Sequence, residues 1–469
     1  MLTGILKYHD EDYLFVFQEG IDEMELIPAD TRSTIQPKTD FHLNGITADF
    51  EPMKMDAPFL IGNINENQNK IVFVTIKNSN IKQVNNVLYV KLYAYFLLEA
   101  DDNGLIDKLT LESPEIDHIF SVNRAFNFSF QDIKDFNRKG TVTIKTNDFD
   151  STSSHPQYFK VEDKEISLSF QINRTISTAI GKPPLIINSV LCFEFEPTDD
   201  YLFIINLCHY ARNFIRFLCF RKNIYFTSVD IYKPIENNKH QHFGKISLFE
   251  DNQKSEIEPI ETNRCIKYEY IMGNEGTILN DIATNQIYLR HLPKSYEDGK
   301  HIDVSSFIMI TSAFEWEFSR NYPDGIIKKE STLKAEKAVS EAVSELLEKS
   351  TGKQKNIYNF LLRLVYSDPL QSKIIQFGKD YSNIIDDFGK YMYNLNQIDF
   401  NYKDIGERVS AQRNHFAHGD LHQEFINEAL LDVVFLKEVV YVLQLKRYGL
   451  SDENIRRSIN DVFRHNFAL

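Results

Sequence analysis

The sequence predicts an α+β protein in which a β-rich N-terminal domain precedes an all-α helical bundle. Two stretches, Phe126 to Phe130 and Ile166 to Ile172, place apolar side chains at every second position. That period is typical of strands with one buried face and one wet face. From about residue 302 onward, apolar residues recur at steps of three and four instead, as they do in helices that share a core. The change of period divides the chain into two structural classes.

Residues 1–235 are predicted to form the β-rich domain, as an antiparallel sandwich or a barrel-like sheet. Lys70 to Lys77 and Val87 to Leu98 are rich in β-branched and aromatic residues, and polar loops separate such runs. One helix interrupts the strands, because apolar residues recur at helical spacing from about Thr198 to Phe217. The arginines of this helix project away from its apolar, core-facing stripe, and we expect solvent or carboxylates as their partners.

Residues 236–299 are predicted to connect the two domains through short strands and a helix. The stretch 233–245, which follows a strand and contains a proline, is typical of a linker. Beyond it we expect strands at Gly244 to Phe249 and Cys265 to Met272, and a short helix at Asn280 to Leu292.

Residues 300–469 are predicted to form the helical domain, with short connections that favour an up-and-down bundle. Proline and glycine residues mark several of the breaks between helices. The expected helices cover 302–320, 331–349, 356–366, 374–394, a helix from about 404 to Gly419, 421–448 and 452–463.

Composition limits the classes of function. The net charge of −15 argues against a general nucleic-acid coat, so an RNA site would have to be a local basic cleft. The N-terminus lacks the apolar core of a signal peptide, and polar residues interrupt the most apolar run, Tyr201 to Phe220. These features predict a cytoplasmic protein that is not embedded in a membrane.

Cysteine and histidine spacing predicts neither a metal site nor a cofactor. The four cysteines stand far apart with no C-x-x-C pair, which suits reduced thiols. His240 and His242 form an H-x-H pair, but no acidic or histidine partner follows at a recognisable spacing. We therefore expect no bound metal.

The strongest candidate for chemistry is the string Arg413-Asn414-His415-Phe416-Ala417-His418. An arginine holds a phosphate in a forked grip at any working pH, and a histidine exchanges protons near neutrality. Residues five apart lie roughly 140° apart on an ideal helix, so the pair converges only if the helix ends within the motif, where Gly419 is a natural stop. A helix end with a surface arginine and a capping histidine would give the same pattern.

The motif and its helical surroundings resemble the HEPN superfamily, whose mark is Arg, four to six residues, then His, often with Asn directly after the Arg. Asn414 fits that place. A β-rich domain before such a helical domain is most similar to the ApeA group within that superfamily. This resemblance implies a metal-independent endoribonuclease that acts in bacterial anti-phage defence by abortive infection, with 2′,3′-cyclic phosphate products.

The resemblance also implies roles for individual residues. His418 would be the general base or acid, Arg413 would hold the scissile phosphate, and Asn414 would orient either group. An acidic residue of the first helix often lies near the site, and Glu315 is the candidate, although it could equally be an ordinary helix-surface carboxylate. We interpret His415 and His422 as bystanders.

The expected partners follow from the same interpretation. RNA is the expected substrate, and the basic tail residues Lys446, Arg447, Arg456 and Arg457 could contact it or could simply form a solvated helix surface. HEPN domains commonly pair about a two-fold axis, so we expect a homodimer or higher even-numbered oligomer, with helices 302–320 and 421–448 as candidate interfaces. The N-terminal domain would sense a phage-derived trigger. The alternative function is a non-catalytic HEPN module that binds a partner or senses a signal.

Overall fold

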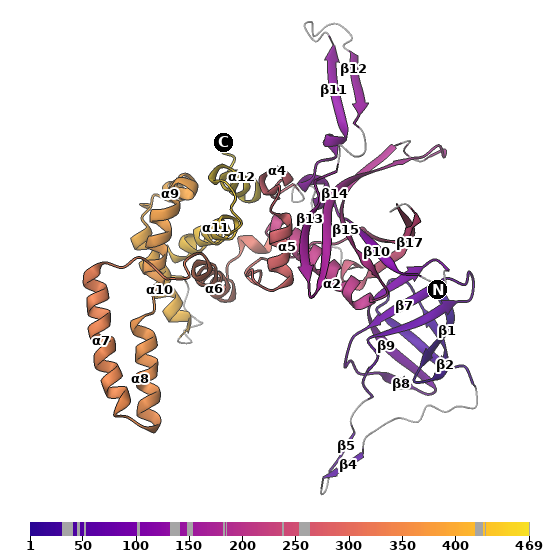
Figure 1. Ribbon diagram of the computed structural model, residues 1–469, viewed down its shortest axis with the longest axis horizontal. Coiled ribbons are helices and arrows are strands. Elements are labelled where there is room, and N and C mark those ends of the chain that lie inside the picture. Colours follow the sequence, from indigo (N-terminus) through magenta and orange to yellow (C-terminus); the bar gives the residue numbers. More distant parts are fainter. Residues whose placement is uncertain are drawn as a thin grey trace. The chain divides into compact units, whose positions relative to one another are not determined.

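The computed structural model describes residues 1–30, 41–44, 47–50, 53–100, 104–131, 141–147, 153–181, 183, 185–236, 239–252, 263–417, 425–426 and 428–468. They form two compact units, Met1–Gln286 and Ile287–Leu469. The first unit is built mainly from strands and the second from helices (Figure 1). The predicted α+β class and the order of its two parts are therefore confirmed.

The first unit begins with a closed ring of six antiparallel strands. They follow one another in the order β9-β3-β2-β1-β6-β7, and β7 pairs again with β9, which closes the sheet on itself. Of the two predicted arrangements, the structure has the barrel-like one. The six strands are β1 (Leu2–Tyr8), β2 (Glu11–Phe17), β3 (Glu23–Pro28), β6 (Phe59–Ile64), β7 (Lys70–Thr75) and β9 (Val87–Leu98).

A second run of antiparallel strands continues from the ring, because β9 pairs with strands of the ring and also with β17. The first half of β9 pairs with β3, and its second half, from Ala94 to Leu98, pairs with β17. The sheet then continues in the order β17-β16-β10-β15-β14-β13. These strands are β10 (Ile106–Glu112), β13 (Gln157–Val161), β14 (Lys164–Ile176), β15 (Leu185–Thr198), β16 (Ser228–Ile235) and β17 (Lys239–Leu248).

Smaller elements complete the first unit. The short strand β8 pairs with β9, and two further strand pairs stand apart from the large sheet. The short elements are β8 (Lys82–Val84), the pair β4 (Phe41–Asn44) and β5 (Thr47–Phe50), the pair β11 (Phe126–Gln131) and β12 (Thr141–Thr146), α1 (Pro114–Ile119), α4 (Tyr268–Ile271), α5 (Glu275–Ala283), and the 3₁₀ turns η1 (Val122–Ala125) and η4 (Phe249–Asn252).

Helix α2 (Tyr201–Cys219) is the predicted helix of this unit, and most of its side chains are buried. Its arginines have carboxylate partners, as expected. Arg212 is almost fully buried and lies 2.5 Å from Glu250 and 2.7 Å from Asp251. Just after the helix, Arg221 and Glu115 form a second buried pair at 2.7 Å. These pairs connect α2 and the residue just after it to the segment that follows β17 and to α1.

Two predictions for the connecting segment are wrong. Residues 233–245 are not a linker, because β16 and β17 form a hairpin there and pair in antiparallel register. Cys265 to Met272 is not a strand, because the segment ends in helix α4. Its buried Cys265, Ile266, Tyr268 and Ile271 fit the spacing of either structure in so short a stretch. The helix expected at Asn280 to Leu292 is present only in part, because α5 begins earlier and ends at Ala283.

The second unit is a helical bundle organised around α11. Most of the α11 residues are buried, including polar Asp432, Glu438 and Gln444. No helix in the described parts of the chain is both long and apolar enough to cross a membrane. The helices are α6 (Val304–Asn321), α7 (Glu330–Glu348), α8 (Gly352–Val365), α9 (Leu370–Leu395), α10 (Tyr402–Ala417), α11 (Ala429–Arg447) and α12 (Asp452–Phe463), preceded by the 3₁₀ turn η5 (Asp298–Lys300).

One buried carboxylate joins three helices of the bundle. Asp432 on α11 is fully buried and accepts two hydrogen bonds from the Arg408 guanidinium on α10, at 2.6 and 2.7 Å. The Tyr393 hydroxyl on α9 donates a third at 2.6 Å. Burial and the neighbouring Asp432 raise the pKa of Tyr393 far above its usual value, so the hydroxyl keeps its proton and remains a donor.

Replacing this carboxylate should destabilise the helical unit strongly. Asp432→Ala leaves the half-buried Arg408 cation without its main counter-ion, and breaking such a pair costs about 3–5 kcal/mol of unfolding free energy. The only tryptophan, Trp316, lies on α6, so its fluorescence during denaturant titration reports this unit. Glu453→Ala removes a carboxylate from an exposed pair with Arg457, and its cost should stay below about 1 kcal/mol. Equal costs for the two variants would contradict the proposed role of Asp432.

Candidate active site

Arg413 lies on the last turns of α10, and its side chain is 41 % exposed. The Glu315 carboxylate of α6 contacts both terminal nitrogens of the Arg413 guanidinium. One nitrogen lies 2.7 Å from Oε2, and the other lies 3.4 Å from Oε1. The structure thus brings together two of the predicted site residues that are 98 positions apart in the sequence. The Glu315 carboxylate fixes the direction of the Arg413 guanidinium.

A third helix adds a cation to this pair. The Nζ atom of Lys373, on the first turn of α9, lies 3.7 Å from Oε1 of Glu315. Its side chain is mostly buried. Sequence analysis did not single out Lys373, because an isolated lysine after a proline carries no motif. Only the packing of α9 against α6 and α10 reveals that Arg413 and Lys373 share one carboxylate.

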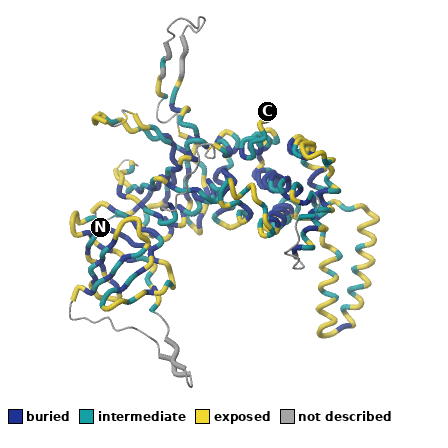
Figure 2. Tube along the Cα trace, turned by 180° about the vertical axis from the view of Figure 1, so that it is seen from behind, coloured by how far each residue is buried: buried dark blue, intermediate teal, exposed yellow. Residues whose placement is uncertain are grey.

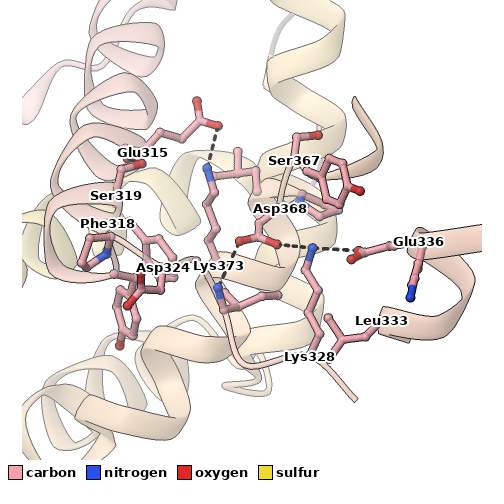
Figure 3. A pocket seen from close by; sticks show the side chains of 18 of the residues that line it. Glu315, Phe318, Ser319, Asp324, Lys328, Leu333, Glu336, Ser367, Asp368 and Lys373 are labelled. Carbon is pink, nitrogen blue, oxygen red and sulfur yellow. Dashed lines mark hydrogen bonds and ion pairs between the residues drawn. The ribbon is translucent and has the colours of Figure 1, made fainter. Parts of the chain in front are cut away.

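Glu315 and Lys373 lie on one side of a cleft of about 970 Å³ within the helical unit (Figure 3). Arg413 also lines this cleft. On the other side, Lys328 lies between Glu336, at 2.7 Å, and Asp368, at 3.1 Å. Lys337 and Asp324 complete the charged lining, so that four cations face four carboxylates. The cleft is therefore polar and electrically balanced, and an anion would have to compete with the carboxylates for the cations.

The end of α10 is held by aromatic packing. The Phe416 ring contacts the Phe307 ring of α6 edge to face, with centroids 5.3 Å apart, and the Phe425 ring packs against both. The buried side chain of Gln412 also accepts a hydrogen bond from the Ile426 backbone at 2.8 Å. These contacts bring the chain on both sides of residues 418–424 to the same place against α6.

The predicted general base, His418, lies outside the described residues, as do Gly419 and His422. Asn414 is exposed and makes no side-chain hydrogen bond to the described residues. His415 is partly exposed on α10. The structure therefore defines the position of Arg413, whereas the position of His418 relative to Arg413 is not part of the described structure.

A second arginine in the region has the same kind of spacing. Arg408 is followed seven residues later by His415, which also fits a pattern of Arg, four to six residues, then His. The packing separates the two arginines, since Arg408 is committed to buried Asp432 with a bidentate grip. Arg413 is the more exposed of the two and is the one that lines the cleft.

The four basic tail residues have partners inside the chain. Lys446 lies 2.5 Å from Asp452, and Arg456 lies 2.7 Å from Asp387. Arg447 is mostly buried and lies 3.1 Å from fully buried Glu317, and Arg457 pairs with Glu453 one turn earlier. These contacts account for the four cations without RNA, and none of the four residues lines the cleft.

The two helices expected to form an interface differ in what they expose. Helix α11 uses its apolar surface within its own domain, and among its large apolar residues Leu430 is the exposed one. Helix α6 leaves Ile308, Met309 and Trp316 partly exposed. The prediction underestimated how much of α11 the bundle itself buries.

The charge of the chain is unevenly divided between its units. Ile287–Leu469 contains 24 lysines and arginines and 26 aspartates and glutamates, for a net charge of −2, which leaves −13 of the total −15 on Met1–Gln286. The acidic excess that argues against nucleic-acid binding thus belongs to the β-rich unit. The helical unit is close to neutral.

The described residues contain no group of three or more histidine, cysteine or acidic side chains arranged to hold a metal ion. The two histidines of the H-x-H pair contact different carboxylates: His240 lies 3.0 Å from Asp107 and 3.7 Å from Glu194, and His242 lies 3.2 Å from Asp230 and 3.6 Å from Glu99. The two histidines therefore face different partners along the hairpin.

Removing the Glu315 charge should cost little stability. The Arg413–Glu315 pair is partly exposed, and such pairs contribute about 1 kcal/mol or less. Glu315→Gln should therefore change the free energy of unfolding by no more than that, as measured through Trp316 fluorescence. Glu330→Gln, in an exposed pair with Lys334, is the matched control. A loss of several kcal/mol for Glu315→Gln alone would identify the pair as a structural element of the bundle.

Comparison of the chain with protein-family models, with curated proteins and with solved structures finds no match. The function must therefore be inferred from the residues themselves and from the cleft that they line.

Proposed function

We propose that the protein is an endoribonuclease of the HEPN type, with Arg413 as the phosphate-binding residue and His418 as the proton-transfer residue. The observation that supports it most is the position of Arg413: a partly exposed guanidinium, oriented by Glu315, at the edge of a large polar cleft. In the proposed biological role, RNA cleavage arrests growth of a phage-infected bacterium, as the family resemblance implies.

The Glu315 contact leaves Arg413 able to bind a phosphate. A guanidinium carries five N–H donors in a fixed fork, and Glu315 takes one donor from each terminal nitrogen. The remaining three donors are enough for two non-bridging phosphate oxygens. Glu315 thus acts as a positioning residue, since it fixes the plane of the guanidinium. Lys373, on the same carboxylate, adds positive charge nearby.

The proposed reaction needs only RNA, a base, an acid and a fixed cation. A base removes the proton of the ribose 2′-hydroxyl, and the 2′-oxygen attacks the adjacent phosphorus. The bond from phosphorus to the 5′-oxygen breaks, and that oxygen takes a proton from an acid. The products are a 2′,3′-cyclic phosphate and a 5′-hydroxyl. Arg413 would stabilise the negative charge that grows on the phosphoryl oxygens.

Chain connectivity is compatible with His418 as the proton-transfer residue. Four helical steps from Arg413 to Ala417 rise about 6 Å, and the next Cα follows at about 3.8 Å. The spacing alone therefore keeps position 418 within about 10 Å of Arg413, Cα to Cα. Two long side chains can bridge that distance around one phosphate. Asn414, exposed on the same turns of α10, is the proposed orienting residue.

The non-catalytic alternative also has one observation in its favour. Arg413 already has a carboxylate partner, and the charges lining the cleft balance. In that case the pair would only join α6 to α10, and RNA would gain nothing from Arg413. Cleavage assays on matched variants separate the two functions.

RNA cleavage should persist in EDTA. The proposed chemistry uses arginine and histidine, so chelation of divalent ions should leave the initial rate on an unstructured RNA nearly unchanged. The measurement is cleavage of an unstructured oligoribonucleotide with mapped ends, which should carry 2′,3′-cyclic phosphates. Complete loss of activity in EDTA, restored by added Mg²⁺ or Mn²⁺, would refute the mechanism.

Variants of the motif should separate catalysis from structure. His418→Ala and Arg413→Ala should each lower the cleavage rate by at least about 10²-fold, the usual effect of losing positioned proton transfer or one electrostatic donor. Arg413→Lys should fail similarly because lysine lacks the bidentate fork. His415→Ala is the matched control and should retain activity.

Two results would overturn these roles. If His418→Ala stays active while a folded His415→Ala is inactive, then His415, and not His418, is the proton-transfer residue. Full activity in Arg413→Ala would favour the non-catalytic alternative for this arginine. Thermal unfolding of each variant shows whether a loss of activity reflects a loss of folding.

A further inference from the structure

Helices α7 and α8 form an antiparallel hairpin that has no core of its own. None of their residues is buried, whereas α11 in the same unit is buried along most of its length (Figure 2). The base of the hairpin is attached through Lys328, which pairs with Glu336 of α7 and with Asp368 just before α9. Beyond that base, the two helices contact each other along half-buried faces.

One face of the hairpin is apolar and exposed. On α8, Ile357, Phe360, Leu361 and Leu364 follow the i, i+3, i+4, i+7 spacing of a single stripe and are 38–60 % exposed. On α7, Val339 and Leu346 are seven residues apart and about half exposed. On each helix, the exposed stripe is rotated about the helix axis in the same sense from the half-buried face that contacts the other helix. Because the two helices run antiparallel, both stripes therefore lie on the same side of the hairpin. Such a continuous apolar face is typical of a surface that packs against another helical element.

The charges on the hairpin indicate what that element is. Helix α7 carries five glutamates and two lysines, for a net charge of −3, and α8 carries Lys353, Lys355 and Arg363 with no acidic residue, for a net charge of +3. The three α8 cations, and Glu345 and Glu348 of α7, make no ion pair with the described residues. The hairpin therefore holds unpaired charges of both signs, segregated by helix.

We propose that the α7–α8 hairpin is a self-association surface, which packs face to face with the hairpin of a second copy of this chain to form a four-helix bundle. With the two-fold axis parallel to the helices, each α8 lies antiparallel to the α7 of the second copy. This arrangement covers both apolar stripes and sets the +3 helix against the −3 helix on each side. It also brings both helical units to the same end of the assembly. The proposal does not depend on RNA cleavage.

Disruption of the stripe should dissociate the full-length protein. Phe360→Glu combined with Leu364→Glu places two charges on the α8 stripe, at positions that are 60 % and 49 % exposed. We expect wild type to be a dimer at low micromolar concentration by light scattering. The double variant should have a dissociation constant on the order of a hundredfold higher or more, because two apolar side chains lose their burial. The control, Lys334→Ala combined with Glu341→Ala, changes two exposed residues on the opposite side of α7 without altering its net charge, and should stay dimeric.

Charge reversal identifies the second copy as the partner. Lys353→Glu with Lys355→Glu makes both helices acidic, and Glu345→Lys with Glu348→Lys makes both helices basic. Each double variant alone should dimerise at least about tenfold more weakly than wild type, because like charges face each other across the axis. A mixture of the two should form heterodimers, in which opposite charges meet again, and native mass spectrometry resolves them by mass.

Three outcomes would overturn the proposal. One is a monomeric wild type at tens of micromolar. Another is an assembly that Phe360→Glu with Leu364→Glu leaves unchanged, since its interface would lie elsewhere. The third is a mixture of charge-reversed variants that forms no more heterodimer than a mixture of wild type with either one. Circular dichroism melts confirm that the variants remain helical, and the mass readout is independent of any ribonuclease activity.

Discussion

The buried contact of Asp432 with Arg408 and Tyr393 fixes the part of the helical unit on which the candidate site depends. It links α9, α10 and α11 through charge-assisted hydrogen bonds of 2.6 to 2.7 Å. A carboxylate buried this deeply tolerates only one arrangement of its partners, since any shift would leave a charge unpaired. Arg413 lies five residues beyond Arg408 on α10, so the rotation of α10 that serves Asp432 also determines where Arg413 emerges.

The second constraint comes from α6, which presents two glutamates with different roles. Glu317 points into the bundle, where it accepts hydrogen bonds from the Tyr288 backbone and Gln444, at 3.0 and 3.1 Å, and pairs with Arg447. Burial raises the pKa of Glu317 above its usual value. Glu315, two residues earlier, reaches the cleft instead and holds Arg413. The internal anchor of Glu317 therefore sets the rotation of α6, and with it the position of the carboxylate that orients Arg413.

The sequence predicts the parts of this protein that depend on local periodicity, and it fails where long-range pairing decides. Alternating Ile166 to Ile172 becomes a strand, and the three- and four-residue steps after residue 302 become helices, because burial of one face is a local property. Closure of the sheet into a ring depends on β9 pairing with both β3 and β7, which no local pattern records. The expectation that Glu315 lies near the site came from a family resemblance, whereas no motif could have revealed Lys373. The tail cations show the opposite error, since Arg447 and Arg456 looked free in sequence but have internal carboxylate partners.

The exposed hairpin and the candidate site share structural elements, so the proposed assembly and the proposed chemistry would be physically coupled. Lys337 and Tyr366, from the base of the α7–α8 hairpin, line the same cleft as Arg413 and Lys373. Lys328 holds that base in place through Glu336 and Asp368, and both carboxylates raise the pKa of Lys328 and keep it charged. If the hairpin packs against a second copy, its position becomes fixed. The contacts of Lys328 with Glu336 and Asp368 would then also fix the side of the cleft that these residues line. The half of the unit that binds the second copy would then also determine the width of the cleft that Arg413 lines.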